Sequence, residues 1–282
     1  MLDRRLRNAQ IFTDTEQRYK NDITLVEAIK ESIKNQTFIA ENSFIFLPME
    51  KGLKKAKVVV SGKRSLEAAQ LYAEQNKKVC VLNFASATNP GGGVVNGSSA
   101  QEECICRCTT LYPCLNTQEM WDKFYLPHRK ANNPLYNDDS IYTPDVVVFK
   151  SDINFPESLA KEDWWKVNIL TCAAPNLRER PSNAMNPNAG TIAAKVTQAE
   201  LEKLLTSRIK RIFEVAVANG NEVLVLGAFG CGAFRNPPEI VAKVFYNVMQ
   251  DYLDKLEVIE YAVFHTEREL ANYEAFSKVM RG

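Results

Sequence analysis

From about residue 57 onward, the chain alternates short apolar segments with amphipathic ones. Apolar runs of this length predict buried strands, and apolar positions at helical spacing predict helices that pack on them. We expect strands within KVVVSG, KKVCVLNFA, PDVVVFK, VNILTCAAPN, NEVLVL and EYAVFH. Strands that alternate with helices are typical of an α/β fold, in which a sheet lies between helical layers.

Capping residues mark the expected helix boundaries. Ser65 is expected to cap a helix over SLEAAQLYAEQ, and Thr197 with Glu200 forms a capping box ahead of LEKLLTSRIKRIFEVAVANG. Gly220 stands where the second of these helices should end. A further helix is predicted to open with QEECICRC and to continue until Pro113, since proline disfavours a helix interior.

Two segments depart from this alternation. Residues 121–142 are polar and rich in proline and asparagine, which predicts a surface excursion or hairpin. Residues 1–56 contain a helical pattern, TLVEAIKESIKN, followed by FIFLP, and no flexible linker separates them from the rest. We therefore expect an N-terminal helical accessory region over residues 1–56, packed on a main domain over residues 57–282.

The charges of the chain nearly cancel, with 35 lysines and arginines against 34 acidic residues. A balanced chain has no long-range field that attracts polyanions, so neither direct nucleic-acid binding nor membrane binding is expected. The opening MLDRRLRNAQ leads into no apolar run, and the sequence therefore predicts neither a secretory signal nor a transmembrane helix.

The seven cysteines are an odd number without the regular spacing of a secreted disulfide scaffold. This pattern favours reduced thiols and a cytoplasmic location. Four of the cysteines crowd into CICRCTTLYPC, but a metal cluster usually shows CxxC pairs with histidine partners, and the chain has only two histidines. We expect no metal site and interpret these cysteines as small residues packed along a helix.

Two glycine-rich loops each follow a predicted strand: NPGGG at residues 89–93 and GAFGCGAF at residues 227–234. Glycine lets the backbone turn sharply and bring its N–H groups against a ligand, and N–H groups beside a helix N-terminus favour anions. Neither loop has the lysine and hydroxyl residue of a P-loop or the spacing of a dinucleotide motif. Either loop alone is more simply a tight turn, but the pair predicts a diphosphate cradle.

Glu102 and Glu103 stand side by side after the first loop. Neighbouring carboxylates repel and burial disfavours charge, so one of them can have a raised pKa and keep a proton to donate. A helix N-terminus would act in the opposite direction, and a charged first helical turn is the simpler interpretation of such a pair. Cleavage of a glycosidic bond needs a proton for the departing oxygen.

The ordered combination is more specific than its parts. A triple glycine, a short spacer and QEE, within LNFASATNPGGGVVNGSSAQEE, resemble the catalytic motif of microbial-type poly(ADP-ribose) glycohydrolases. The later LGAFGCGAFRNPP is similar to the phosphate-binding loop of that family. The resemblance implies a three-layer α/β/α macrodomain-like sandwich with a mixed central sheet, which binds ADP-ribose at the carboxyl ends of its central strands.

By the same resemblance, Glu103 matches the catalytic acid, Glu102 holds the terminal ribose and Gln101 fixes the loop. Phe234 would pack on that ribose, and Phe264 is a candidate either to face the adenine or to lie in the core. The full set of expected ligand-binding residues comprises Gln101, Asn83, Asn89, Gly91, Gly92, Gly93, Gly230, Cys231, Gly232, Ala233 and Phe234.

The activity implied is that of a hydrolase that cleaves ribose–ribose O-glycosidic bonds of poly(ADP-ribose) and releases ADP-ribose, with no cofactor and no metal. The expected partner is poly(ADP-ribose) or ADP-ribose, including polymer attached to modified proteins, and the chain is expected to be a monomer. Two alternatives remain: an ADP-ribose-binding reader that does not cut, and a hydrolase of another ADP-ribose derivative. The intact QEE argues against the reader.

Overall fold

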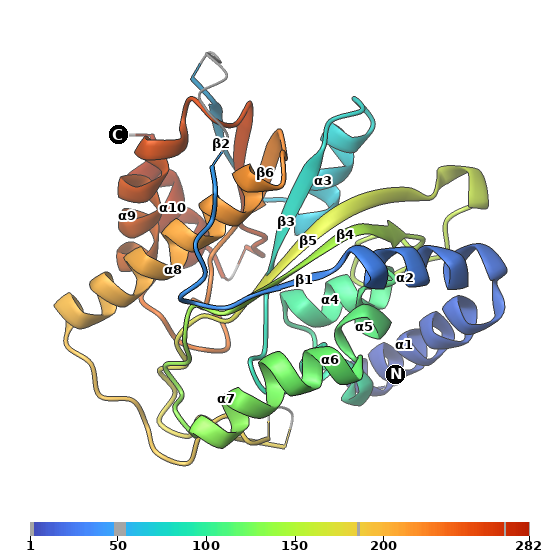
Figure 1. Cartoon of the computed structure of the whole chain (residues 1–282), viewed down its shortest axis with the longest axis horizontal. Coiled ribbons are helices and arrows are strands. Elements are labelled where there is room, and N and C mark those ends of the chain that lie inside the picture. Colours follow the sequence, from blue (N-terminus) through green and yellow to red (C-terminus); the bar gives the residue numbers. More distant parts are fainter. Residues whose placement is uncertain (1–2, 48–54, 185–186, 268, 282) are drawn as a thin grey trace.

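The computed structural model describes residues 3–47, 55–184, 187–267 and 269–281. In these residues, seven strands form one mixed sheet in the order β1-β4-β5-β3-β6-β7-β2. Figure 1 shows this sheet with helices on both sides. The neighbours β1, β4 and β5 are antiparallel, and β5, β3, β6, β7 and β2 run parallel. The strands are β1 (Thr37–Ile39), β2 (Lys57–Ser61), β3 (Val79–Phe84), β4 (Ser140–Val148), β5 (Trp165–Cys172), β6 (Val223–Leu226) and β7 (Val258–Ala262).

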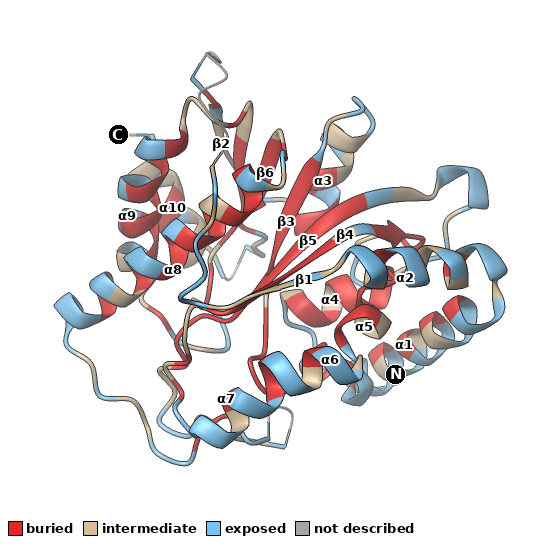
Figure 2. Cartoon of the chain, viewed as in Figure 1, coloured by how far each residue is buried: buried red, intermediate tan, exposed pale blue. Residues whose placement is uncertain are grey.

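All six strands expected from residue 57 onward are confirmed, and so is the α/β fold. Helices cover both faces of the sheet, and the central strands are largely buried (Figure 2). These strands are apolar on both sides: in β3, Cys80 and Leu82 pack in one hydrophobic cluster and Val79 and Val81 in another. The first cluster includes α8 (Gln198–Ala218), α9 (Pro238–Met249) and α10 (Ala271–Met280). The second includes α1 (Arg4–Asn21), α3 (Ser65–Ala73), α4 (Gln101–Cys108) and α5 (Leu111–Leu115).

The N-terminal residues pack closely on this sandwich. The hydroxyl of Thr15 in α1 donates to the carbonyl oxygen of Arg107 in α4 at 2.7 Å. The buried ammonium of Lys150 lies 2.6 Å from the Asp14 carboxylate and donates to a carbonyl oxygen of α1. After α2 (Ile23–Asn35), β1 pairs with β4, so the region before residue 57 adds a strand to the same sheet.

The helix that opens with Gln101 ends earlier than predicted. It stops at Cys108, because Thr109 is extended and forms an isolated bridge with Val148 at the end of β4. Helix α5 then begins at Leu111 and contains Pro113. Proline is tolerated in a first turn, where its missing N–H group has no intrahelical partner to lose. The prediction of one helix ending at Pro113 was therefore wrong.

The surface excursion or hairpin predicted for residues 121–142 was wrong for residues 121–131, which are helical, whereas residues 132–139 form an irregular connection. After α6 (Gln118–Met120), a π-helical turn (Trp121–Tyr125) leads into α7 (Leu126–Ala131), and β4 already begins at Ser140. This segment is polar in composition, but one face of it packs against the protein, with Phe124, Tyr125 and His128 buried. A helix can start here because its proline stands in the first turn.

Two capping predictions had different outcomes. Thr197 and Glu200 form the expected capping box of α8, and Gly220 follows the helix with a φ of +68°. Ser65, in contrast, is the first helical residue of α3 rather than its cap. Its hydroxyl instead accepts a hydrogen bond from the Gln101 side chain at 3.0 Å.

The topology places the two glycine-rich loops together. Strands β3 and β6 are parallel neighbours, with Cys80 opposite Leu224. Their carboxyl ends therefore meet at one edge of the sheet, and the NPGGG and GAFGCGAF loops leave from that edge. In parallel α/β sheets, this edge is where ligands bind.

Candidate active site

Gln101 joins the helix that carries the two glutamates to the sheet. Its side-chain amide donates to the Leu82 carbonyl oxygen at 2.7 Å, and its oxygen accepts from the Phe84 N–H at 2.9 Å. With the bond to Ser65, Gln101 fixes α4 against both β3 and α3. Glutamine supplies both a donor and an acceptor at one position, which a glutamate could not do when ionised.

The first loop reaches the glutamates through its bare backbone. Gly91 and Gly92 have φ angles of +65° and +58°, which favour glycine. A Cβ atom on Gly92 would lie only 2.5 Å from Oε1 of Glu103 and 3.0 Å from Oε2 of Glu102. Gly93 then donates its N–H to Oε1 of Glu103 at 2.9 Å. Glycine at position 92 is thus required by close approach to the acids, whereas a Cβ atom on Gly91 would lie 2.8 Å from the Tyr112 ring.

Glu102 is held as a hydrogen-bond acceptor. It is 2% exposed, and its two oxygens accept from the Asn83 amide at 3.3 Å and from the Ser86 N–H at 2.7 Å. The Ser86 bond comes from the backbone, so it does not depend on the side chain at that position. Burial, and after it the charge of Glu103, raises the pKa of Glu102 well above its ordinary value.

Glu103 has one oxygen bound and one without a partner. It is 7% exposed, and among the described residues its Oε2 has no hydrogen-bond partner. Burial raises the pKa of Glu103, although the Gly93 N–H and the nearby Arg107 guanidinium act to lower it. Burial therefore outweighs the helix N-terminus, and the raised pKa of each acid favours the protonated form that a proton donor needs.

The remaining candidates of the first loop region have different surroundings. Asn83 is fully buried in β3, and its amide donates both to Glu102 and to the Thr171 hydroxyl, so it fixes Glu102 against the sheet. Asn89 accepts from Arg129 at 2.7 Å and donates to the Pro187 carbonyl oxygen at 3.0 Å. These bonds link the NPGGG loop to α7 and to the segment before α8.

The second loop places two glycines in contrasting positions. Gly230 has a φ of +75°, and a Cβ atom there would lie 2.5 Å from the Cβ of Ala174. A Cβ atom on Gly232 would meet nothing within 4 Å. Gly230 therefore serves the packing of the loop, whereas Gly232 faces open space. The N–H of Cys231 donates within the loop, to the Ala228 carbonyl oxygen.

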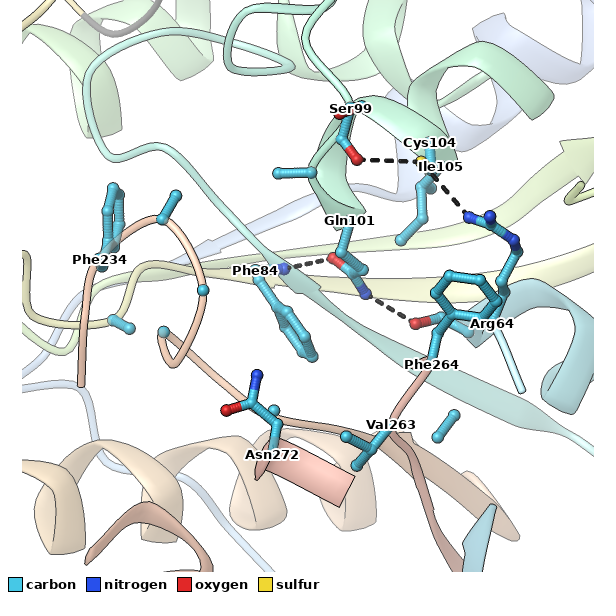
Figure 3. Close-up of a pocket in the computed structure, with 18 of the residues that line it drawn as sticks. Arg64, Phe84, Ser99, Gln101, Cys104, Ile105, Phe234, Val263, Phe264 and Asn272 are labelled. Carbon is cyan, nitrogen blue, oxygen red and sulfur yellow. Dashed lines mark hydrogen bonds between the residues drawn. The ribbon is translucent and has the colours of Figure 1, made fainter. Parts of the chain in front are cut away.

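Two adjoining cavities lie along these loops. The first, the Phe264 cavity, has a volume of about 270 Å³, and Figure 3 shows Phe84, Phe264, Asn272 and Gln101 around it. The second, the Glu103 cavity, measures about 540 Å³ and is lined by both glutamates with Gly92 and Gly93. The two share the lining residues Phe84, Ser99, Ala100, Ala233 and Phe234. Together they match the size of a small-molecule site, which is about 300–1,000 Å³.

Phe234 stands at the boundary of the two cavities, and Phe264, 47% exposed, belongs to the cavity wall and not to the core. The guanidinium of Arg64 lies 4.0 Å from the centroid of the Phe264 ring. Asp152 also lines this cavity; it accepts from the Leu66 N–H, while its Oδ1 is buried without a partner among the described residues. Arg64 and Asp152 were not predicted from the sequence, since neither stands in a glycine loop or next to QEE.

The cysteines take part in packing. All seven are free, and Cys106, Cys108 and Cys114 are buried in α4 and α5. Burial raises the pKa of each of these thiols.

In the described residues, no three potential metal ligands of the His, Cys, Asp and Glu types come together. No helix in that part of the chain is long and apolar enough to cross a membrane.

Comparisons with solved structures point to one group of enzymes. Poly(ADP-ribose) glycohydrolase from Thermomonospora curvata is 26% identical, with a TM-score of 0.82 over 96% of this chain and 98% of that one. Its complex with the inhibitor ADP-HPD gives 27% identity and a TM-score of 0.79, with the same coverage. A point mutant of the Deinococcus radiodurans enzyme, in complex with ADP-ribose, is 27% identical and has a TM-score of 0.73 over 89% of this chain and 96% of that one.

No curated protein matches the chain. At the sequence level, residues 9–151 match the family described as the catalytic domain of microbial-type PARG. This match contains the NPGGG loop, both glutamates and most of the N-terminal helices, and the structural matches extend over the rest of the fold. The chain belongs to the microbial-type PARG catalytic domain family.

Proposed function

We propose that the chain is a poly(ADP-ribose) glycohydrolase that hydrolyses ribose–ribose O-glycosidic bonds and releases ADP-ribose. The family match and the likeness to two bacterial enzymes of that name support the proposal. The observation that carries it is Glu103, a buried carboxyl group with a raised pKa and one oxygen without a partner among the described residues, in the wall of a cavity.

The two cavities suggest how the ligand lies. We place the terminal ribose beside Glu102 and Glu103, and the diphosphate along Gly230, Gly232 and Ala233, which line the Phe264 cavity and reach the Glu103 cavity at Ala233. The open space in front of Gly232 leaves room for phosphate oxygens close to the backbone. The adenosine then extends into the Phe264 cavity, whose aromatic side chains suit a flat base.

The hydrogen bonds favour Glu103 as the proton donor. Both oxygens of Glu102 accept bonds from N–H groups, which suits an ionised carboxylate that also holds ribose hydroxyls. Glu103 lines the Glu103 cavity, and its Oε2, which has no hydrogen-bond partner among the described residues, is available to hold a proton. Burial is the main cause of the raised pKa of Glu102, and the charge of Glu103 adds to it; the second contribution disappears once Glu103 holds the proton.

The reaction proceeds in two steps. Glu103 donates its proton to the glycosidic oxygen as the bond from that oxygen to C1″ breaks, and positive charge develops on the ring of the terminal ribose. The oxygen leaves as a hydroxyl group of the preceding unit. Water then attacks C1″ and gives a proton back to the Glu103 carboxylate, which restores the acid. The substrate diphosphate stabilises the developing cation by its charge.

Turnover separates this function from the alternatives. Wild-type protein is incubated with purified poly(ADP-ribose), and free ADP-ribose is followed by chromatography. The proposal predicts steady release of ADP-ribose. An ADP-ribose reader would bind ADP-ribose without releasing any from the polymer, and a hydrolase of another derivative would release it only from a different substrate, such as a singly ADP-ribosylated protein.

We further propose that the chain acts as a cytoplasmic monomer on polymer attached to modified proteins. The seven free cysteines, most of them buried, suit a reducing compartment. We also treat residues 1–56 as an accessory region of the catalytic unit, because α1 packs directly on α4, the helix that carries the glutamates. Light scattering tests the monomer, and limited proteolysis tests the boundary near residue 56.

A further inference from the structure

Two arginines from distant parts of the chain line the Glu103 cavity. Arg5 belongs to the first turn of α1, and Arg178 lies in the connection that follows β5. Besides Glu102 and Glu103, they are the charged residues among the described side chains that line this cavity. Neither arginine lines the Phe264 cavity.

The position of Arg5 is fixed by the fold. The Asn8 amide donates to the Gly97 carbonyl oxygen at 3.2 Å, and the buried Lys150 holds the middle of the same helix. A Cβ atom on Gly97 would collide with the backbone oxygen of Arg5. The loop between NPGGG and QEE therefore touches the first turn of α1 directly, and this contact brings Arg5 to the cavity.

The structure of the polymer indicates what this end of the Glu103 cavity would bind. If the terminal unit occupies the Phe264 cavity and the shared boundary, the scissile bond lies at Glu103, and the preceding unit must leave through the part of the Glu103 cavity that is not shared. That preceding unit carries its own diphosphate. Guanidinium groups bind phosphate oxygens with two parallel hydrogen bonds, so arginine suits this position.

We propose that Arg5 and Arg178 form a leaving-side subsite that binds the diphosphate of the ADP-ribose unit preceding the scissile bond. This inference rests on the proposed glycohydrolase function. It assigns the accessory helix α1 a direct part in substrate binding, and it predicts that the chain distinguishes polymer from free ADP-ribose by electrostatics. The two arginines are positioning residues and take no part in proton transfer.

The test uses Arg5→Gln, Arg178→Gln and the double variant in the full chain. Arg4→Gln and Arg180→Gln are matched controls, because both residues are exposed, lie in the same two segments and do not line the cavity. We expect kcat/KM on poly(ADP-ribose) to fall about three- to tenfold in each single variant, mainly through KM, and about 10- to 100-fold in the double variant. The dissociation constant for ADP-ribose should stay within about twofold of wild type, since ADP-ribose does not reach this subsite.

Salt gives a second readout that a purely structural role would not change. The kcat/KM of the wild type should fall more steeply between about 50 and about 300 mM NaCl than that of the double variant, since two screened charges have been removed. Thermal melts of all variants within about 2 °C of wild type would show that folding is intact. Arg5→Lys should retain part of the activity, since it keeps the charge.

Three outcomes overturn the proposal. Unchanged kcat/KM in the double variant would show that the two arginines do not bind the substrate. An equal loss in the matched controls would show that the effect comes from the overall positive charge of the protein and not from these two positions. A parallel loss of ADP-ribose affinity would assign the arginines to the terminal unit. If wild type releases no ADP-ribose, the proposed function fails, and the subsite is then tested by binding of poly(ADP-ribose) against ADP-ribose: loss of polymer affinity alone in the double variant would still support it.

Discussion

Gly92→Ala separates the chemical role of the first loop from its role in stability. The new Cβ atom would stand 2.5 Å from Oε1 of Glu103, at a φ of +58°. A non-glycine residue at such an angle costs about 1–2 kcal/mol, offset by about 0.4–1 kcal/mol from the lower entropy of the unfolded chain. To relieve the contact, the Glu103 carboxyl must shift and lose its alignment with the Gly93 N–H.

Gly220→Ala is the matched control. Gly220 has a φ of +68°, but the nearest atom to a Cβ there is Nζ of Lys78 at 4.0 Å. Neither Gly220 nor Lys78 lines the Phe264 cavity or the Glu103 cavity. Both variants should unfold about 2–4 °C below wild type, as expected for a net cost of about 1 kcal/mol in a chain of this size. A misplaced catalytic group can lower the rate about 100-fold, so we expect this loss in kcat for Gly92→Ala alone.

The assay measures initial rates of ADP-ribose release from poly(ADP-ribose) beside thermal melts of both variants. Equal melting temperatures with a selective loss of kcat in Gly92→Ala would support the close approach of this loop to Glu103. If Gly92→Ala keeps a kcat within about threefold of Gly220→Ala, the loop does not constrain the catalytic carboxyl.

Three further predictions follow from the same site. Burial raises the pKa of Glu103 above its ordinary value of 4.5, so the contribution of this carboxyl group to folding stability is full below that value and is lost as pH rises through the folded pKa. The melting temperature of Glu103→Gln minus that of wild type should therefore be larger at about pH 8 than at about pH 5. An equal difference at both pH values would contradict the raised pKa. The wild-type kcat should fall as pH rises through that pKa, because only the protonated acid is active, and a rate that increases steadily to about pH 9 would argue against Glu103 as the donor. Gly232→Ala should keep the stability of wild type but weaken ADP-ribose binding by about 1–3 kcal/mol, as calorimetric titration would measure. Gly230→Ala should lose thermal stability, because its new Cβ atom is forced against Ala174. Unchanged ADP-ribose binding by Gly232→Ala would exclude the proposed position of the diphosphate.

The local sequence pattern predicted much of the fold. Each strand from residue 57 onward contains a short apolar run, and the loops after β3 and β6 contain the expected glycines. The pattern failed where tertiary contacts decide the structure. Helix α4 ends at Cys108 because the next residue bridges to Val148, a partner far along the chain. The helical turns after Gln118 depend on aromatic residues packing beneath a polar surface.

The candidate site was predictable where it is local. QEE and the triple glycine are close neighbours in the sequence and touch in the structure, as the Gly93 to Glu103 hydrogen bond shows. Arg5 and Arg178 could not be found in this way, because only the folded chain brings α1 and the segment after β5 to one cavity. The net effect on the pKa of Glu103 also required the structure, since burial and the helix N-terminus act in opposite directions.

Comparison of Glu103→Gln with wild type is the most direct test of Glu103 as the acid that releases ADP-ribose. The amide keeps the shape of the side chain and an oxygen for the Gly93 N–H, but it has no acidic proton to donate. We predict that the rate of ADP-ribose release from poly(ADP-ribose) falls by about 10²- to 10⁴-fold while the dissociation constant for ADP-ribose changes by less than about threefold. A variant that releases ADP-ribose at the wild-type rate would show that Glu103 is not the proton donor.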